Sequence, residues 1–450
     1  MVAVAGAGAS SPVPPRVVPD PRPNVLIVLT DDQTLDTLPT DPAAMPWFQS
    51  QLQDRGGHWL WFPHAVVSTP LCCPSRATIL TGRFDSHTGV RDNYQGQNLD
   101  DTDTLAVWLH DAGYRTGLVG KYLNFYPWGR PPFIPPGWDR WFAKENADES
   151  TAYYDYEVVD QVIERRYSSS PEDYATDVLG AEAVRFVQRA PLDRPWFLYF
   201  SPNAPHLPWI ASPTHAGAFA HVEPPTPSLG EMNDVRGKPA YVQSLAPKTA
   251  ADRQAYIEAD RNERAMLLSV DDWFERLVAA IAARGELDRT VIVFLTDNGY
   301  TLGLHRLDGK RFPYTPSIGV PFAIRTPWAP AATVDDIVSN LDVAGTIAEL
   351  AGVTPGLPQD GMSLVPALRG QPLPHRAGVF LDWGGDEVAP PWRGVITPRF
   401  VYIRNADGFD ELYRATDPLQ LHNAAGDRAA RHLTERGRAL LTTWAAEADG

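Results

Sequence analysis

Two apolar runs, NVLIVLT at residues 24–30 and TVIVFLT at residues 290–296, constrain the fold more than any other part of the sequence. Continuous runs that are rich in β-branched residues are typical of strands buried inside a parallel sheet. Further strand-like runs (YRTGLVG, RPWFLYFSP and VPFAIRT) alternate with helical patterns at residues 104–113, 263–285 and 334–352. This alternation predicts an α/β fold in which helices sandwich a large, mostly parallel sheet.

Changes in composition and in the pattern of strands and helices divide the chain into three parts. Residues 1–22 are small, apolar and then proline-rich, and they predict a flexible tail or the remnant of a signal peptide. A large domain is expected over residues 23–370. Short strand-like runs and a closing helical pattern predict a small C-terminal α+β subdomain with an antiparallel sheet over residues 371–450. Two stretches inside the large domain, 125–170 and 207–250, are expected to be long loops.

Composition argues against some classes of protein. The formal net charge of −16 disfavours a general nucleic-acid binder, because such a protein needs a basic face. The sequence predicts no transmembrane segment, which would need a run of about 20 apolar residues. The 2 cysteines cannot form a disulfide framework, so they do not reveal the redox compartment. A secreted or periplasmic location is favoured, and a cytoplasmic one stays open.

Polar residues directly follow the two apolar runs at residues 24–30 and 290–296. Asp31 and Asp32 follow the first run, and Asp297 and Asn298 follow the second. In open α/β sheets, ligands bind beyond the carboxyl ends of the strands. These side chains offer only oxygen donors, which suit Ca²⁺ or Mg²⁺ and suit zinc poorly. The alternative interpretation of each pair is a turn or a helix N-cap.

The two cysteines are adjacent, in LCCPSRATILTGR at residues 71–83. Pro74 fits the first turn of a helix, and Gly82 fits the residue just past its end. Cys72 would then lie at the helix N-terminus, where backbone N–H groups favour an anion. Arg76, one turn later, would lie on the same side of the helix. The alternative is a buried structural thiol.

In chain order, these segments resemble the formylglycine-dependent sulfatase family, whose fold is alkaline-phosphatase-like. CCPSRATILTGR is similar to the family signature, and PNVLIVLTDDQ and FLTDNGYTLGLH are similar to its two metal segments. GYRTGLVGKYLN and APHLPW resemble its Lys and His segments, and ELYRATDPLQLHNAAG resembles its C-terminal ending. The strings LCCPSRA, GKYLN and SVDD are most similar to the branch of N-acetylglucosamine-6-sulfatases and arylsulfatases.

The resemblance implies a role for each matching residue. Cys72 is the position that a separate maturation enzyme converts to Cα-formylglycine, whereas Cys73 stays a thiol. The implied ligands of one Ca²⁺, with Mg²⁺ less favoured, are Asp31, Asp32, Cys72, Asp297 and Asn298. Arg76 matches the residue that holds the formylglycine hydrate. The residues expected around the sulfate, each a weak signal if taken singly, are Lys121, His206 and Lys310. Leu123 stands where many sulfatases have a His, and Asn124 after it is a candidate for substrate binding.

The implied reaction is hydrolysis of a sulfate ester. A cysteine thiolate would be left as a stable S-sulfonate, whereas a formylglycine hydrate attacks sulfur through one hydroxyl and expels sulfate with the other. His206 or Lys310 would protonate the leaving oxygen. The expected substrate is a sulfated small molecule or glycan, namely a sugar sulfate such as N-acetylglucosamine 6-sulfate or an aryl sulfate.

Some residues and functions keep two interpretations. Four aromatic residues of the long stretches either stack on a sugar or pack in the interior, namely Tyr153, Tyr154, Tyr156 and Trp209. His305 is expected to be structural. The alternative functions are a phosphate or phosphonate ester hydrolase of the same superfamily and a non-catalytic binder of sulfated glycans. The first lacks an obvious paired-His metal segment here, and the second would be expected to have lost some of these residues.

Overall fold

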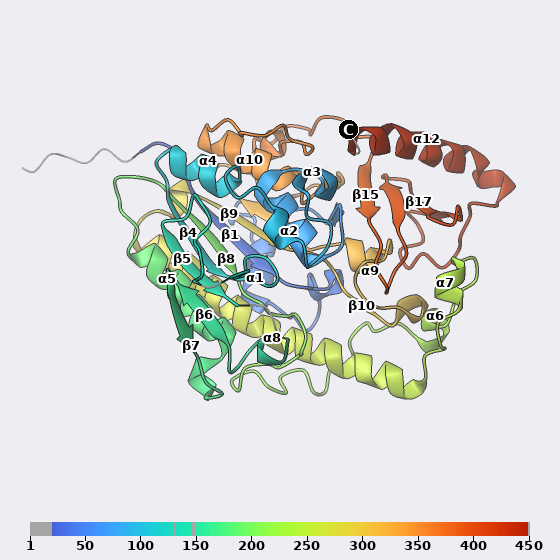
Figure 1. Cartoon of the computed structure of the whole chain (residues 1–450), viewed down its shortest axis with the longest axis horizontal. Coiled ribbons are helices and arrows are strands. Elements are labelled where there is room, and N and C mark those ends of the chain that lie inside the picture. The colour runs from blue at the N-terminus through green and yellow to red at the C-terminus, as the bar shows by residue number, and fades with distance from the viewer. Residues whose placement is uncertain (1–19, 130, 146–148, 449–450) are drawn as a thin grey trace, which may run out of the picture.

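The computed structural model describes residues 20–129, 131–145 and 149–448. Its centre is a ten-stranded sheet (Figure 1), in which five neighbouring strands run parallel. In spatial order these five are β9 (Thr290–Thr296), β1 (Asn24–Thr30), β8 (Trp196–Ser201), β4 (Arg115–Gly120) and β5 (Arg140–Lys144). The carboxyl ends of these strands therefore meet at one edge of the sheet, as the sequence predicts.

Shorter strands extend the sheet on both sides. Beyond β9 lie β12 (Phe322–Arg325), β2 (Trp59–Trp61) and β13 (Ala332–Thr333), and beyond β5 lie β6 (Glu157–Asp160) and β7 (Ile163–Arg166). β12, β6 and β7 each run antiparallel to the strand before them in this order. Two small ladders lie outside the sheet, β3 (Ala65–Val66) with β14 (Val338–Ser339) and β10 (Thr301–Leu302) with β11 (Asp308–Gly309).

Helices cover both faces of the sheet because the strands are apolar on both faces. In β1, Val25, Ile27 and Leu29 pack against one layer, while Leu26 and Val28 pack against the other. The first layer contains α2 (Cys72–Thr81), α4 (Leu105–Asp111) and α10 (Asp342–Ala351). The second contains α1 (Pro46–Gln53), α5 (Ala175–Gln188) and the long α8 (Ala250–Ala283). Short helices complete this part, namely α3 (Asp85–Thr88), α6 (Leu229–Met232), α7 (Ala240–Gln243), α9 (Thr315–Ile318) and α11 (Val365–Leu368).

A second, smaller sheet lies at the end of the molecule away from β6 and β7 (Figure 1). Its four antiparallel strands are β15 (Val379–Trp383), β16 (Trp392–Ile396), β17 (Phe400–Asn405) and β18 (Asp410–Arg414). The helix α12 (Arg431–Ala448) packs on one face of this sheet, and the other face packs against residues around α9. The predicted fold class is thus confirmed. The division at residue 370 stays a prediction, and most of the expected tail lies outside the described residues.

One expected helix is longer than predicted, and two other expectations about local structure were wrong. The helix expected at residues 263–285 begins earlier, at Ala250, because Thr249 and Asp252 form a capping box that satisfies N–H groups of its first turn. Residues 334–352 are not one helix, since 338–339 form β14 and the helix starts at Asp342. The stretch 125–170 is not a plain loop, because it contains the short strands β5, β6 and β7.

The stretch 207–250 is closer to expectation, because its regular elements are only the two short helices α6 and α7. Over the part of the chain that the structure describes, none of the helices has the length and apolar character needed to span a bilayer.

Candidate active site

The two central strands bring the predicted oxygen ligands together. β1 and β9 pair in register up to Thr30 and Thr296, so the polar residues that follow start at the same level. The backbone N–H of Asp32 donates to Oδ1 of Asp297 at 3.2 Å, and Asn298 Nδ2 donates to Oδ1 of Asp32 at 2.6 Å. Asp31 and Asp297 are fully buried, and Asp32 is 4% exposed. The carboxylates therefore form one buried cluster and do not act as exposed turn residues.

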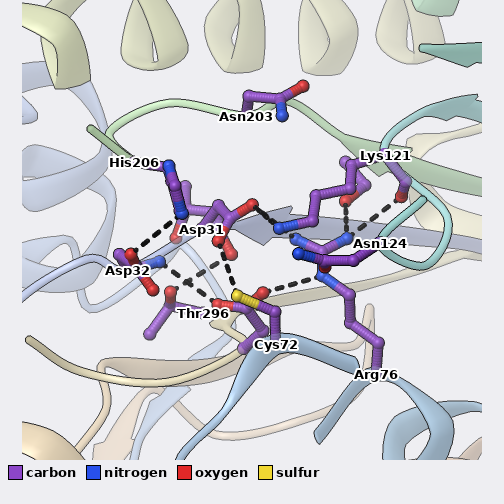
Figure 2. Close-up of polar contacts among 12 residues, drawn as sticks. Asp31, Asp32, Cys72, Arg76, Lys121, Asn124, Asn203, His206 and Thr296 are labelled. Carbon is purple, nitrogen blue, oxygen red and sulfur yellow. Dashed lines mark hydrogen bonds and ion pairs between the residues drawn. The ribbon is translucent and has the colours of Figure 1, made fainter. Parts of the chain in front are cut away.

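The N-terminus of α2 points Cys72 at this cluster. Cys72 is the first residue of the helix, and Gly82 ends it with a φ of +71°, a left-handed conformation that glycine adopts without strain. Cys72 Sγ lies 3.5 Å from Asp31 Oδ1 and 3.0 Å from Lys310 Nζ. Figure 2 shows the thiol directed at Asp31. The helix predicted from Pro74 and Gly82 is thus the element that presents Cys72.

Arg76, one turn further along α2, contacts residues at the ends of four strands, namely β9, β1, β4 and β8. Its Nε donates to Asp297 Oδ2 at 2.7 Å, and one terminal nitrogen lies 3.3 Å from Asp31 Oδ2. The other terminal nitrogen donates to the backbone oxygen of Lys121 and to Oγ of Ser201, at 3.0 and 2.7 Å. Ser201 was missed by the sequence reasoning. The available signal was its place as the last residue of a buried parallel strand.

Two lysines and a histidine complete the cluster. Lys121 Nζ donates to Asp31 Oδ2 at 2.5 Å, and Lys310 Nζ donates to the two carboxylate oxygens of Asp32 at 2.6 and 2.7 Å. His206 Nε2 lies 3.4 Å from Asp32 Oδ2, while its Nδ1 lies 2.6 Å from the backbone oxygen of Leu207. In Figure 2, His206 and Lys121 lie on opposite sides of Asp31. The structure thus brings together nine of the ten predicted site residues.

Burial and charge act against each other throughout the cluster. Burial alone would lower the pKa of both lysines, but the carboxylates raise it above the ordinary value, chiefly Asp31 for Lys121 and Asp32 for Lys310. Burial alone would raise the pKa of Asp31, but the surrounding cations, Lys121 first, hold it below its ordinary value. Burial raises the pKa of the Cys72 thiol. The carboxylate of Asp31 and the ammonium groups of Lys121 and Lys310 therefore stay ionised.

The donor set fits a hard divalent cation. Asn298 Oδ1 is buried and has no hydrogen-bond partner among the residues that the structure describes. Ligand atoms of Asp31, Asp32, Cys72 and His206 all lie within 4.8 Å of one another. Carboxylate oxygens that converge in a buried space repel each other unless a cation lies between them. The buried cluster therefore offers oxygen donors that could hold a metal ion, and the unsatisfied amide oxygen of Asn298 is one of them.

Asn124 is the predicted residue that lies apart from these charges. Its backbone N–H donates to Cys73 Sγ at 2.9 Å, and its Oδ1 lies 3.6 Å from the same sulfur. The backbone N–H of Cys73 donates to Asn93 Oδ1 at 3.0 Å. Burial raises the pKa of Cys73 to about 12, so this thiol stays protonated. Substrate binding by Asn124 stays a prediction.

The aromatic residues of the long stretches are mostly interior. Tyr153 and Tyr156 are each 1% exposed, and the hydroxyl of Tyr153 donates to the backbone oxygen of His206. Tyr154 packs on Tyr174, and Trp209 packs edge-on against Tyr300. For Tyr153 and Tyr156 the structure favours the packing alternative over sugar stacking.

His305 lies away from the carboxylate cluster, as its expected structural role requires. Its ring nitrogens lie 3.0 Å from the backbone oxygen of Asp234 and 2.9 Å from that of Leu419. The ring packs edge-on against Tyr314. Burial lowers the pKa of His305 to about 4.

Comparisons with known proteins agree with this geometry. The family model described as Sulfatase matches residues 23–353, and the model described as N-sulphoglucosamine sulphohydrolase, C-terminal, matches residues 303–446. The N-acetylglucosamine-6-sulfatase of Homo sapiens is 34% identical over 384 residues, which cover 81% of this chain and 68% of that protein.

Two solved structures share the fold at lower identity. One, in complex with its substrate D-glucosamine-2-N,6-O-disulfate, superposes with a TM-score of 0.81 at 24% identity, over 95% of this chain and 98% of the other. The phosphonate monoester hydrolase of Agrobacterium radiobacter superposes with a TM-score of 0.78 at 21% identity, over 95% and 96%. The fold alone therefore does not separate sulfate esters from phosphonate esters.

Proposed function

Because the chain belongs to the sulfatase family of sulfuric ester hydrolases, we propose that it removes sulfate from a sulfated sugar, with Cα-formylglycine at Cys72 and Ca²⁺ as the bound metal. The family expected from the motifs is confirmed by the family match and by the 34% identity. The substrate, the modified residue, the metal and the role of each residue belong to the proposal.

The observation that carries the proposal is the setting of Cys72. Its sulfur lies 3.0 Å from Lys310 Nζ and 3.5 Å from Asp31 Oδ1, inside a cluster that also holds Arg76 and Lys121. A sulfate group that approaches this position meets cations on several sides. A formylglycine at residue 72 supplies a hydrated aldehyde, a nucleophile that can expel sulfate, whereas a thiol would be left as a stable S-sulfonate.

The charges of the cluster support a bound divalent cation. Three carboxylates (Asp31, Asp32 and Asp297) face three cations (Arg76, Lys121 and Lys310), so their formal charges cancel. Asp31, Asp32, Asp297 and Asn298 would hold Ca²⁺, which supplies positive charge that shields the sulfate and activates the hydroxyl of residue 72. The local charge would then be positive, although the whole chain carries −16.

The fixed cations have distinct tasks in this proposal. Lys121 and Lys310 stabilise the negative charge that grows on the sulfate oxygens as the ester bond breaks. Arg76 holds Asp31 and Asp297 in place through its 3.3 and 2.7 Å contacts. Because these groups are buried and held by hydrogen bonds, they do not need to reorganise during the reaction.

His206 is our candidate for the proton donor to the leaving oxygen. Its Nδ1 faces the backbone oxygen of Leu207 at 2.6 Å, which directs Nε2 toward Asp32 at 3.4 Å. Lys310 is the second candidate because its ammonium lies 3.0 Å from Cys72 Sγ. Replacing His206 with Asn separates them: if His206 donates, kcat falls far more for an alkyl ester, whose leaving oxygen is basic, than for 4-nitrophenyl sulfate.

The substrate class rests on the relatives. N-acetylglucosamine-6-sulfatases recur among the similar sequences, and one fold relative was solved with a glucosamine disulfate as its substrate. A panel of N-acetylglucosamine 6-sulfate, other sugar sulfates, 4-nitrophenyl sulfate and a phosphonate monoester tests this choice. We expect the highest kcat/KM for a sugar sulfate. Preference for the phosphonate monoester would favour the alternative function that the fold also permits.

Mass spectrometry of the peptide that contains residues 72 and 73 tests the nucleophile directly. In active protein we expect formylglycine at residue 72 and an unmodified thiol at residue 73, which serves as the internal control. Co-production with a formylglycine-generating enzyme should raise the modified fraction and the activity in proportion. A fully active sample in which Cys72 is unmodified would contradict the proposal.

A further inference from the structure

The most exposed large apolar side chain in the described part of the structure belongs to Tyr94, which follows a residue that contacts the helix of Cys72. Tyr94 is 75% exposed, whereas a tyrosine of this size ordinarily buries much of its ring. Its ring stacks on that of Phe125, with centroids 4.8 Å apart and an angle of 16° between the planes. Tyr94 and Phe125 are called the aromatic platform below.

Hydrogen bonds place this platform next to the helix that carries Cys72. Asn93, which precedes Tyr94, accepts the backbone N–H of Cys73 through its Oδ1 at 3.0 Å. Asn124, which precedes Phe125, donates its backbone N–H to the sulfur of Cys73 at 2.9 Å. Both rings therefore lie one residue away from groups that contact Cys73. Since Cys73 directly follows Cys72, the platform lies at the same end of α2 as the nucleophile.

The loop that carries Tyr94 is held in place. The backbone N–H of Tyr94 donates to Asp92 Oδ1 at 2.7 Å, and that of Arg91 donates to Gln95 Oε1 at 2.9 Å. Two residues on, Gly96 lies so close to its neighbours that a Cβ there would come within 2.9 Å of the Trp128 ring. The ring of Tyr94 is thus presented by packed, hydrogen-bonded backbone, which lowers the entropy lost when a ligand binds.

We propose that the aromatic platform binds the apolar face of a pyranose ring of the sulfated substrate. The inference rests on the proposed function, which places the sulfate at Cys72. A flat aromatic surface that is open to solvent on one side matches the C–H face of a sugar, and ligand sites combine such surfaces with a few polar groups. Arg91 supplies such a group nearby, with a side chain that is 40% exposed and is held by Asp382 at 2.9 Å.

The test compares Tyr94→Ala and Tyr94→Phe on N-acetylglucosamine 6-sulfate, 4-nitrophenyl sulfate and propyl sulfate, which has no ring. For Tyr94→Ala we expect the ratio of kcat/KM for the sugar sulfate to kcat/KM for propyl sulfate to fall about ten-fold. Tyr94→Phe keeps the ring and should hold this ratio within about two-fold of the wild-type value.

Trp328→Ala is the matched control. This exposed aromatic residue, at 47%, follows β12, which runs antiparallel to β9 and so ends at the opposite edge of the sheet from the site. It should leave all three kcat/KM values unchanged. An unchanged ratio in Tyr94→Ala would overturn the proposal, and so would an equal loss on 4-nitrophenyl sulfate, because the platform would then be a contact for aromatic rings in general.

A binding experiment separates this inference from the proposed function. With Cys72→Ser protein, calorimetric titration of N-acetylglucosamine 6-sulfate should give a Kd that rises about ten-fold when Tyr94→Ala is added. If the wild type hydrolyses no sulfate ester but binding still depends on Tyr94, the proposed function fails and the platform stands. If binding does not depend on Tyr94, the platform fails whatever the enzyme hydrolyses.

Discussion

The candidate active site can be compared with a second charged cluster in the interior through three buried lysines. Lys121 and Lys310 lie among the carboxylates of the site, whereas Lys238 lies between the large domain and the small sheet. Burial alone would lower the pKa of all three lysines. In the site the carboxylates outweigh it and raise the pKa of both lysines, but burial prevails at Lys238 and lowers its pKa to about 7.

The partners of each lysine explain this difference. Lys238 Nζ donates to the hydroxyl of Tyr413 at 2.8 Å and to the backbone oxygen of Gln420 at 2.5 Å, with the rings of Tyr314 and Tyr413 each centred 4.3 Å away. Glu411 lies beyond the tyrosines and accepts from Tyr314 at 3.0 Å. Carboxylates that converge, and not burial as such, therefore distinguish the site that demands a cation from a structural cluster.

The largest effect should follow removal of the nucleophile. Cys72→Ala should lower kcat/KM for the preferred sulfate ester by at least about 10⁴-fold, because no other group in the cluster can form the covalent bond. The unfolding temperature should change little in comparison, since the substitution removes one small buried atom. Steady-state kinetics and thermal unfolding on the same samples check this. Residual activity within ten-fold of wild type would show that residue 72 is not the nucleophile.

The next largest effect should be a dependence on metal that distinguishes the active-site cluster from the cluster of Lys238. Dialysis against a chelator should abolish activity and lower the unfolding temperature, and added Ca²⁺ should restore both. Asn298→Ala removes the unsatisfied buried oxygen and should weaken Ca²⁺ binding at least about ten-fold, read from the dependence of the unfolding temperature on Ca²⁺.

Asn405→Ala is the matched control for Asn298→Ala. It removes a buried amide that donates to Glu411 at 2.9 Å in the cluster of Lys238. It should lower the unfolding temperature but leave the Ca²⁺ dependence as in the wild type. If both variants change Ca²⁺ affinity equally, the comparison between the clusters fails.

Lys238→Met tests the structural cluster by itself. The neutral amine makes two hydrogen bonds, which stabilise the fold by about 2 kcal/mol relative to an unfolded chain in which Lys238 is also neutral. Because the pKa of Lys238 is about 7 in the folded state and its ordinary value is 10.5, the unfolded chain binds more protons between these values. Wild-type stability relative to the variant should therefore rise from pH 6.5 to pH 9. Urea unfolding at both pH values measures it, and kcat/KM should not change.

The sequence predicted the site better than the elements around it. β1 and β9 are continuous apolar runs, and the carboxylates directly follow them, so strand pairing alone brings Asp31 and Asp297 together. The ends of α2 could be predicted equally well from the sequence, because Pro74 and Gly82 occupy positions with narrow conformational requirements. Such signals are local in the sequence. The parallel sheet then brings the residues that follow its strands close together.

Features that depend on tertiary contacts were not predictable in this way. The first turns of α8 are polar, and their helical state depends on the Thr249 capping box and on packing that begins further along the helix. β7 is exposed at all four residues, so it has no apolar alternation to detect. The exposure of Tyr94 and the burial of Tyr153 follow from which loops pack together, and residue type does not reveal that.

The smallest effect should come from replacing Cys73, whose neighbour in the sequence is Cys72. The two adjacent cysteines can then be compared directly. The sulfur of Cys73 accepts the N–H of Asn124 and lies in the interior, and no contact links it to the carboxylates of the cluster in the described structure. Cys73→Ala should therefore cost about 1 kcal/mol of unfolding free energy, because that N–H loses its acceptor. It should change kcat/KM by less than about three-fold, since α2 keeps its other contacts. Parallel measurements on Cys72→Ala and Cys73→Ala check this, and equal losses of activity would mean that the adjacent thiols share the chemistry.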